Sequence, residues 1–159
     1  RDQPRSRGLG DVYKRQEKKG VSRMLYKSFV YSKESEQIID SHEKKMKLLY
    51  EKKIEQYKEQ FSKIGCELEF GFQKYNLNGK SSDRSKNGYV SSVSCGIYKD
   101  GEVICTDEEE YFTLIWSWGI CSVSREWFRK EVCLWDESED IERDIAELYA
   151  GALEYLKKQ

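Results

Sequence analysis

The stretch GYVSSVSCGIYKDGEVICTD, residues 88–107, limits what this chain can fold into more than any other. Its centre, Lys99-Asp100-Gly101-Glu102, is typical of a two-residue β-hairpin turn, because Asp-Gly accepts the positive φ angles which that turn requires. One face of the first strand carries the larger apolar residues Tyr89, Val93, Cys95 and Ile97. Its other face carries the small residues Ser92, Ser94 and Gly96. The pattern predicts an antiparallel sheet, and the small residues would let a helix or another chain approach closely.

Residues 32–65 have the period of one long helix. A stripe at steps of four and three is formed by Met46, Tyr50, Ile54, Tyr57, Phe61 and Ile64. Ser32 can cap the start, and Gly65 can take the left-handed position past the end. At 1.5 Å per residue the helix would be about 50 Å long. It must therefore cross a whole sheet or pair with another subunit, so a homodimer through residues 33–64 is one hypothesis.

Two further segments have clear patterns. In CELEFGF, residues 66–72, apolar and polar positions alternate, which predicts a half-buried strand. At the C-terminus, acids in the first turn and two final lysines flank an apolar stripe, which predicts an amphipathic helix. This stripe consists of Ile141, Ile145, Leu148, Ala152 and Tyr155.

Three segments are less clear. The polar loop Asn76 to Gly88 is longer than most hairpin connections, and loops of this length are functional or disordered. In residues 106–118 a capping box favours a helix, whereas the aromatic and β-branched run after it favours a strand. Residues 124–135 are expected to form a short helix with Phe128, Val132 and Trp135 on one side. The fold class is therefore α+β, with a long N-terminal helix, a three- to four-stranded antiparallel sheet and a C-terminal amphipathic helix.

The first 16 residues, RDQPRSRGLGDVYKRQ, resemble a translated sequencing adapter. Residues 11–16 can be spelled GAT GTG TAT AAG AGA CAG, which is similar to the transposase mosaic end used to build sequencing libraries. Lys19-Gly20-Val21 can be spelled as a bacterial ribosome-binding site ahead of Met24. We therefore expect residues 1–16 to be an adapter artefact and residues 17–23 to be untranslated leader. Residues 24–159 would then form one globular domain.

Residues 24–159 contain 26 acidic and 20 basic residues, a net charge of −6, compared with −1 for the whole chain. Such a charge opposes nucleic-acid binding. The five cysteines occur singly, without a C-x-x-C pair, and are expected to be reduced core residues. The sequence also contains neither a membrane-spanning apolar run nor a signal-peptide core. We expect a cytoplasmic protein without membrane or nucleic-acid partners.

Catalytic chemistry has little support in the sequence. His42 is the only histidine and would act in catalysis only if the fold brought a cysteine to it; otherwise it is expected to be a half-exposed helix residue. Glu67 and Glu69 share a strand face, and residues 107–110 form a run of four acids that could bind a cation or act as acid and base. The spacing fits no ordered metal loop. No catalytic residue, metal ligand or cofactor is assigned.

The region with the most aromatic residues is also the most acidic. Seven rings lie between residues 111 and 135, including all four tryptophans, and residues 107–147 carry a net charge of −9. The rings either form the main core or leave a recognition surface beside the acids, where aromatic anchors and an acidic rim would attract a basic partner. The candidate binding residues are Asp107, Glu108, Glu109, Glu110, Trp116, Trp118 and Trp127.

These observations favour a small, acidic, non-catalytic interaction protein of bacterial or phage origin, which binds a basic protein partner as inhibitor or immunity proteins do. One alternative is a carboxylate-dependent hydrolase with a site between the sheet and loop 76–88. A second alternative is a structural subunit that oligomerises through the long helix.

Overall fold

A computed structural model describes residues 25–79, 82–107, 112–113, 115–126 and 128–158. For residues 105–107, 112–113, 115–116 and 126 it describes the backbone only. The adapter, the leader and the start at Met24 fall on residues outside these ranges. They stay sequence-based expectations.

One antiparallel sheet forms the centre of the fold, in the strand order β1-β8-β7-β3-β2, with β4 paired to β3. Its strands are β1 (Leu25–Val30), β2 (Glu67–Asn76), β3 (Tyr89–Lys99), β4 (Glu102–Val103), β7 (Ile115–Glu126) and β8 (Arg129–Trp135). The short strands β5 (Cys105–Asp107) and β6 (Phe112–Thr113) form a separate two-stranded sheet. The α+β class is confirmed, but the expected three- to four-stranded sheet is wrong, since the main sheet has six strands.

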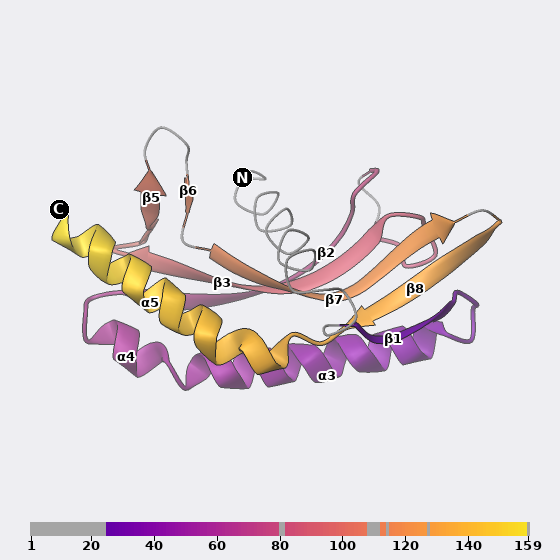
Figure 1. The fold of residues 1–159 in the computed structure, drawn as a ribbon, viewed down its shortest axis with the longest axis horizontal. Coiled ribbons are helices and arrows are strands. Elements are labelled where there is room, and N and C mark those ends of the chain that lie inside the picture. The colour runs from indigo at the N-terminus through magenta and orange to yellow at the C-terminus, as the bar shows by residue number, and fades with distance from the viewer. Residues whose placement is uncertain (1–24, 80–81, 108–111, 114, 127, 159) are drawn as a thin grey trace.

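Within the part of the chain that the structure describes, three helices lie together on one face of the sheet (Figure 1), and the last of them also contacts β5. They are α3 (Glu36–Glu55), α4 (Lys58–Ser62) and α5 (Ile141–Lys157), the last preceded by the 3₁₀ turn η1 (Ser138–Asp140). The amphipathic C-terminal helix is thus confirmed. Among the described residues, no helix is both long and apolar enough to cross a membrane.

The single long helix expected over residues 32–65 is divided and starts later. Ser32 and Ser35 hydrogen-bond each other, and the first turn of α3 follows them. Near its end, the amide of Tyr57 donates to the carbonyl of Ile54, three residues back, which tightens the chain before α4. Phe61 is still buried after this tight turn, so the apolar stripe continues from α3 into α4. The spacing of apolar residues therefore could not show that the helix is divided.

Two strands were missed by the sequence patterns. β1 precedes α3, so the long helix is not the first element; β1 pairs with β8 in the register Phe29↔Val132. The short helix expected in residues 124–135 is wrong, because β7 and β8 form a hairpin there with Val123 opposite Val132. Val132 and Leu134 are buried at a spacing of two, whereas Phe128, expected on the same helix face, is 94% exposed. Pairing with β7 therefore determines the local structure.

The β-hairpin predicted around Lys99-Asp100-Gly101-Glu102 is confirmed. Lys99 pairs with Glu102, and Asp100 and Gly101 take positive φ angles of 52° and 82° between them. Positive φ at both central residues is the geometry of a type I′ turn. It directs the chain back along β3 and then into β5.

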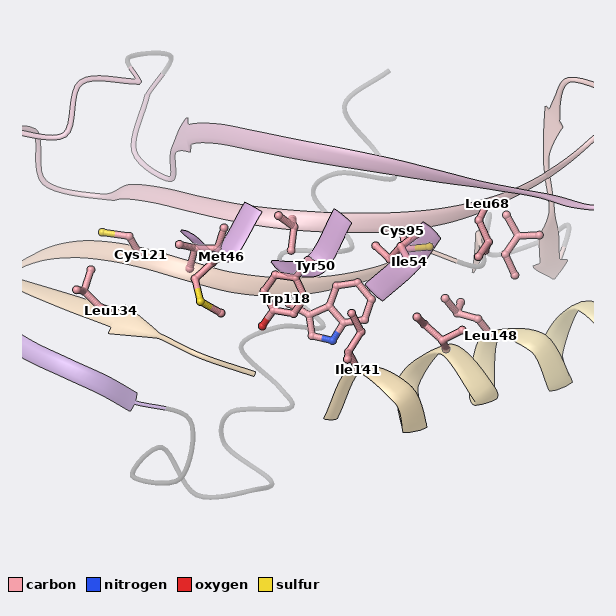
Figure 2. Close-up of a cluster of buried hydrophobic side chains, with 14 of the residues drawn as sticks. Met46, Tyr50, Ile54, Leu68, Cys95, Trp118, Cys121, Leu134, Ile141 and Leu148 are labelled. Carbon is pink, nitrogen blue, oxygen red and sulfur yellow. The ribbon is translucent and has the colours of Figure 1, made fainter. Parts of the chain in front are cut away.

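The core lies between the helices and the sheet. Figure 2 shows side chains of α3 and α5 meeting those of β2, β3, β7 and β8 around Trp118. The ring of Tyr50 stacks on Trp118 with centroids 5.4 Å apart. The apolar positions predicted for the first strand of the hairpin, which is β3, are all buried, namely Tyr89, Val93, Cys95 and Ile97. The four cysteines whose side chains are described are free, and three of them, Cys66, Cys95 and Cys121, are buried as expected.

Candidate functional site

Four exposed acids gather at one end of the sheet, which we call the acidic end: Glu67, Glu69, Asp100 and Glu102. Two come from the start of β2 and two from the β3–β4 turn. The pairs Glu67↔Tyr98 and Lys99↔Glu102 bring these two segments together at this end. Half-buried Lys99 is the basic residue within the turn. The acidic end therefore presents carboxylates from neighbouring segments to solvent.

The β5–β6 pair rises from the same end. Gly96 of β3 pairs with Glu69 on one side and with Ile115 on the other, and β6 leads directly into Ile115. The backbone of Asp107 lies in β5, opposite Phe112. Of the candidate binding residues, Glu108, Glu109, Glu110 and Trp127 lie outside the described ranges, and Trp116 is described by its backbone only. Asp107 thus adjoins the acidic end along the chain.

The acids of residues 107–147 do not form one surface. Those beyond residue 135 lie around the start of α5, in the helix layer (Figure 1). Glu137 and Asp144 are each 1% exposed and face the interior. Glu137 accepts a hydrogen bond from the amide of Gly119 at 2.8 Å, and its own amide donates to the Tyr50 hydroxyl at 3.0 Å. The acids of this range whose side chains the structure describes are therefore divided between β8, the start of α5 and the core.

Trp118, one of the candidate binding residues, belongs to the core. Its side chain is 0% exposed, and its indole Nε1–H donates to Oδ2 of Asp144 at 2.8 Å. Figure 2 shows it enclosed between strand and helix side chains. A buried carboxylate needs such donors, because desolvating an unpaired charge is costly. Trp118 thus connects β7 to α5.

A third buried carboxylate, Glu43 of α3, holds the loop between β2 and β3. Oε1 of Glu43 lies 2.6 Å from the Arg84 guanidinium, and Oε2 accepts a hydrogen bond from the Tyr89 hydroxyl. Arg84 also donates to Asp40 at 2.9 Å. Lys74 of β2 lies 3.9 Å from the same carboxylate. The polar loop is therefore fastened to α3 by ion pairs.

These contacts change the proton affinities of the groups that make them. Although burial opposes the change, the hydrogen bond with Asp40 and the charge of Glu43 raise the pKa of Arg84 above its ordinary value. Burial and the neighbouring Glu43 carboxylate raise the pKa of Tyr89 as well, so its phenol stays protonated and donates. Hydrogen bonds from Lys44 and Arg84 lower the pKa of Asp40 to about 2. The lowered pKa of Asp40 and the raised pKa of Arg84 therefore keep this ion pair charged at neutral pH.

Sequence reasoning missed Glu43, although a signal was present. Glu43 lies four residues after Ile39 and three before Met46, both of which are buried, so a charge occupies the apolar stripe of the helix. A buried carboxylate on the apolar face of a helix indicates that a positively charged group or a hydrogen-bond donor lies beside it. Glu67 and Glu69, the carboxylates of one strand face in the sequence, lie at the opposite end of β2 from loop 76–88, where the hydrolase alternative has its site. The carboxylates that contact the loop are Asp40 and Glu43 of α3.

His42 is more buried than expected, with 6% of its surface exposed. Its Nε2 lies 2.9 Å from the carbonyl oxygen of Trp135, and its ring stacks on Tyr26. Because a carbonyl only accepts, Nε2 carries the proton. Burial lowers the pKa of His42, so the imidazole is neutral at pH 7. The partners that the structure gives His42 are thus a carbonyl and a ring, not a nucleophile.

Within the described ranges, no group of three or more His, Cys, Asp or Glu residues could hold a metal ion. Comparison with known proteins finds no family model, no curated protein and no solved structure that matches this chain.

Proposed function

We propose that this chain is a non-catalytic interaction protein that binds a basic protein partner at the acidic end and the adjoining β5–β6 segment. The observation that carries the proposal is the gathering of Glu67, Glu69, Asp100 and Glu102 at the sheet end from which β5 and β6 rise. The sequence adds the acids of residues 107–110 to the same segment. Complementary charge accelerates encounter with a basic surface and disfavours acidic partners. A cytoplasmic location and a bacterial or phage origin are parts of this proposal.

Trp118 takes no part in the proposed surface, because it is buried and bonded to Asp144. Trp116, next to Ile115 at the start of β7, is retained as a candidate aromatic anchor beside the acids. Trp127 is not retained, because in the sequence it follows Glu126 at the opposite end of β7. An inhibitor or immunity-like role requires a partner whose contact surface is rich in Lys and Arg.

Charge reversal tests the proposal. The variant Glu67→Lys/Glu69→Lys and the variant Asp107→Lys/Glu108→Lys/Glu109→Lys should each lose the partner that co-purifies with the tagged protein. The matched control is Glu139→Lys/Glu147→Lys, which reverses two exposed charges in the helix layer. Binding should also weaken between about 50 mM and 500 mM salt, since exposed charges are screened over a few ångströms at high salt. If the acidic-end variants retain the partner as well as the control does, the proposal fails.

A second candidate, the carboxylate-dependent hydrolase, is favoured by one observation. A cavity of about 480 Å³ lies beside loop 76–88 and is lined by Glu36, Gln37, Asp40, Ser41 and Arg84. Asp40 would act as an ionised base there. Hydrolysis of p-nitrophenyl acetate or phosphate that disappears in Asp40→Asn, with an unchanged circular dichroism spectrum, would favour this candidate over the first.

The third candidate, oligomerisation through residues 33–64, would have to use the outer face of α3, since its inner face packs on the sheet. The outer face is rich in lysine and glutamate. Light scattering after size exclusion, at low and high salt, measures whether such a dimer forms.

A further inference from the structure

A cavity of about 440 Å³ lies between the edge strand β1 and the first half of α3. It is lined by Tyr26, Lys27, Gln37, Ile38, Ser41, His42, Lys45 and Leu134. This volume is within the range of small-molecule sites, about 300–1,000 Å³. The cavity is on the helix side of β1 and is separate from the acidic end at β2.

The lining combines positive charge with a flat apolar wall. Of the described residues that line the cavity, two are lysines and none is a carboxylate. Nζ of Lys45 lies 5.6 Å from the centre of the Tyr26 ring, and that ring stacks on His42 with centroids 5.2 Å apart at 22°. Ile38 and Leu134 extend the apolar wall, while Gln37 and Ser41 contribute polar groups. The described lining of this cavity is therefore suited to an anion with an apolar body.

His42 adds a group that can gain a proton. Its Nε2–H donates to Trp135, so the neutral ring keeps a lone pair on Nδ1. The charged groups around it are Lys45, which opposes protonation, and Glu43 and Asp136, which favour it. From β1, Tyr26 stacks on it, and Lys27 lines the same cavity with its Nζ 5.8 Å from the centre of the Phe29 ring. An anion bound in the cavity would favour the imidazolium form, so binding would be accompanied by proton uptake as the pH falls.

We propose that this cavity binds a small organic carboxylate, with its anionic group between Lys27 and Lys45 and its flat apolar body on Tyr26, Ile38 and Leu134. The lysines give charge-assisted contacts, and the ring gives area for stacking. The site stands on its own observations and is independent of the proposed partner at the acidic end.

Calorimetric titration of the whole protein with benzoate tests the site. Benzamide is the neutral analogue, and inorganic phosphate is the anion without an apolar body. We expect benzoate to bind about tenfold or more tightly than either, because each 1.4 kcal/mol of added contact is about a factor of ten in affinity. Affinity for benzoate should be higher at pH 6.0 than at pH 7.5. Over the same titration the single histidine ring signal in the NMR spectrum should shift.

Variants locate the site. Lys45→Gln removes one exposed charge of the lining and should weaken benzoate about tenfold, whereas Lys52→Gln, a lysine of the same helix outside the cavity, should leave the affinity unchanged. Three outcomes overturn the proposal. The first is that benzoate does not bind at concentrations up to about 10 mM, well above the dissociation constants of specific sites. The second is that benzoate binds no more tightly than benzamide or phosphate. The third is that Lys45→Gln and Lys52→Gln change the affinity for benzoate equally.

Discussion

Nη2 of Arg84 lies 2.6 Å from Oε1 of Glu43, a carboxylate whose side chain is only 2% exposed. The pair joins a polar loop to the buried face of α3. Removing one partner of a buried ion pair leaves an uncompensated charge, which costs about 3–5 kcal/mol. We therefore expect Arg84→Gln to lower the free energy of unfolding by about that amount, measured by urea denaturation.

The double variant Glu43→Gln/Arg84→Gln removes both charges and should lose less stability than Arg84→Gln alone. Arg129→Gln, at an exposed position on β8, is the control and should stay within about 0.5 kcal/mol of the wild type. An Arg84→Gln protein as stable as the Arg129→Gln protein would show that the loop is not held by this pair.

A second prediction compares two tryptophans that each donate an indole hydrogen bond, Trp118 and Trp135. Trp118 donates to the buried Asp144 carboxylate, whereas Trp135 donates to the Ser122 hydroxyl at 3.1 Å. Hydrogen bonds to charged groups contribute about 1.5–3 kcal/mol and neutral ones about 0.5–1.5 kcal/mol. Trp118→Phe should therefore destabilise the protein more than Trp135→Phe in thermal and urea unfolding. The reverse order would contradict the role assigned to Asp144.

The elements whose structure depends only on neighbouring residues in the chain could be predicted from the sequence. The turn at Asp100-Gly101 needs only two residues that accept positive φ, and α5 needs only its stripe and terminal charges. β1 and β8 could not be predicted in this way, because their strand structure depends on pairing with distant segments. Residues 128–135 fit a helix as well as a strand until β7 lies beside them. Local propensity is then overridden by the sheet.

The candidate sites also differ in whether the local sequence could reveal them. Glu43 could have been found, since a charge in the apolar stripe of α3 indicates a buried partner. Arg84 could not be identified as that partner, because nothing local in the loop distinguishes it from Lys80 or Lys86. The cavity beside His42 has no local signal at all. The cavity exists because α3 turns back beside β1, and β1 itself was missed.

The cysteines are expected to differ in reactivity. Burial raises the pKa of Cys95 to about 12 and also raises that of Cys121, so both thiols are protonated and shielded at pH 8. Cys133 is half-buried. With iodoacetamide under native conditions, Cys133 should be alkylated at least roughly tenfold faster than Cys95 or Cys121, since only an accessible thiolate reacts. Peptide mass spectrometry measures the three rates, and equal rates would contradict the packing described.

The final prediction concerns His42, the only histidine of the chain. Burial lowers its pKa in the folded protein below the ordinary 6.5. The unfolded chain therefore binds more protons than the folded chain at pH values just below 6.5, so the free energy of unfolding should fall as the pH drops through this window. The slope for one proton is at most about 1.4 kcal/mol per pH unit.

Because carboxylates ordinarily titrate near pH 4, His42 should account for most of the slope that appears directly below pH 6.5. The variant His42→Gln keeps a side chain able to donate to Trp135 but cannot take up the proton. Its urea midpoint should change little between pH 7.0 and 6.0, whereas that of the wild type should fall. A wild-type midpoint that is constant over this interval, or a slope that survives in His42→Gln, would show that the imidazole is not held neutral by burial.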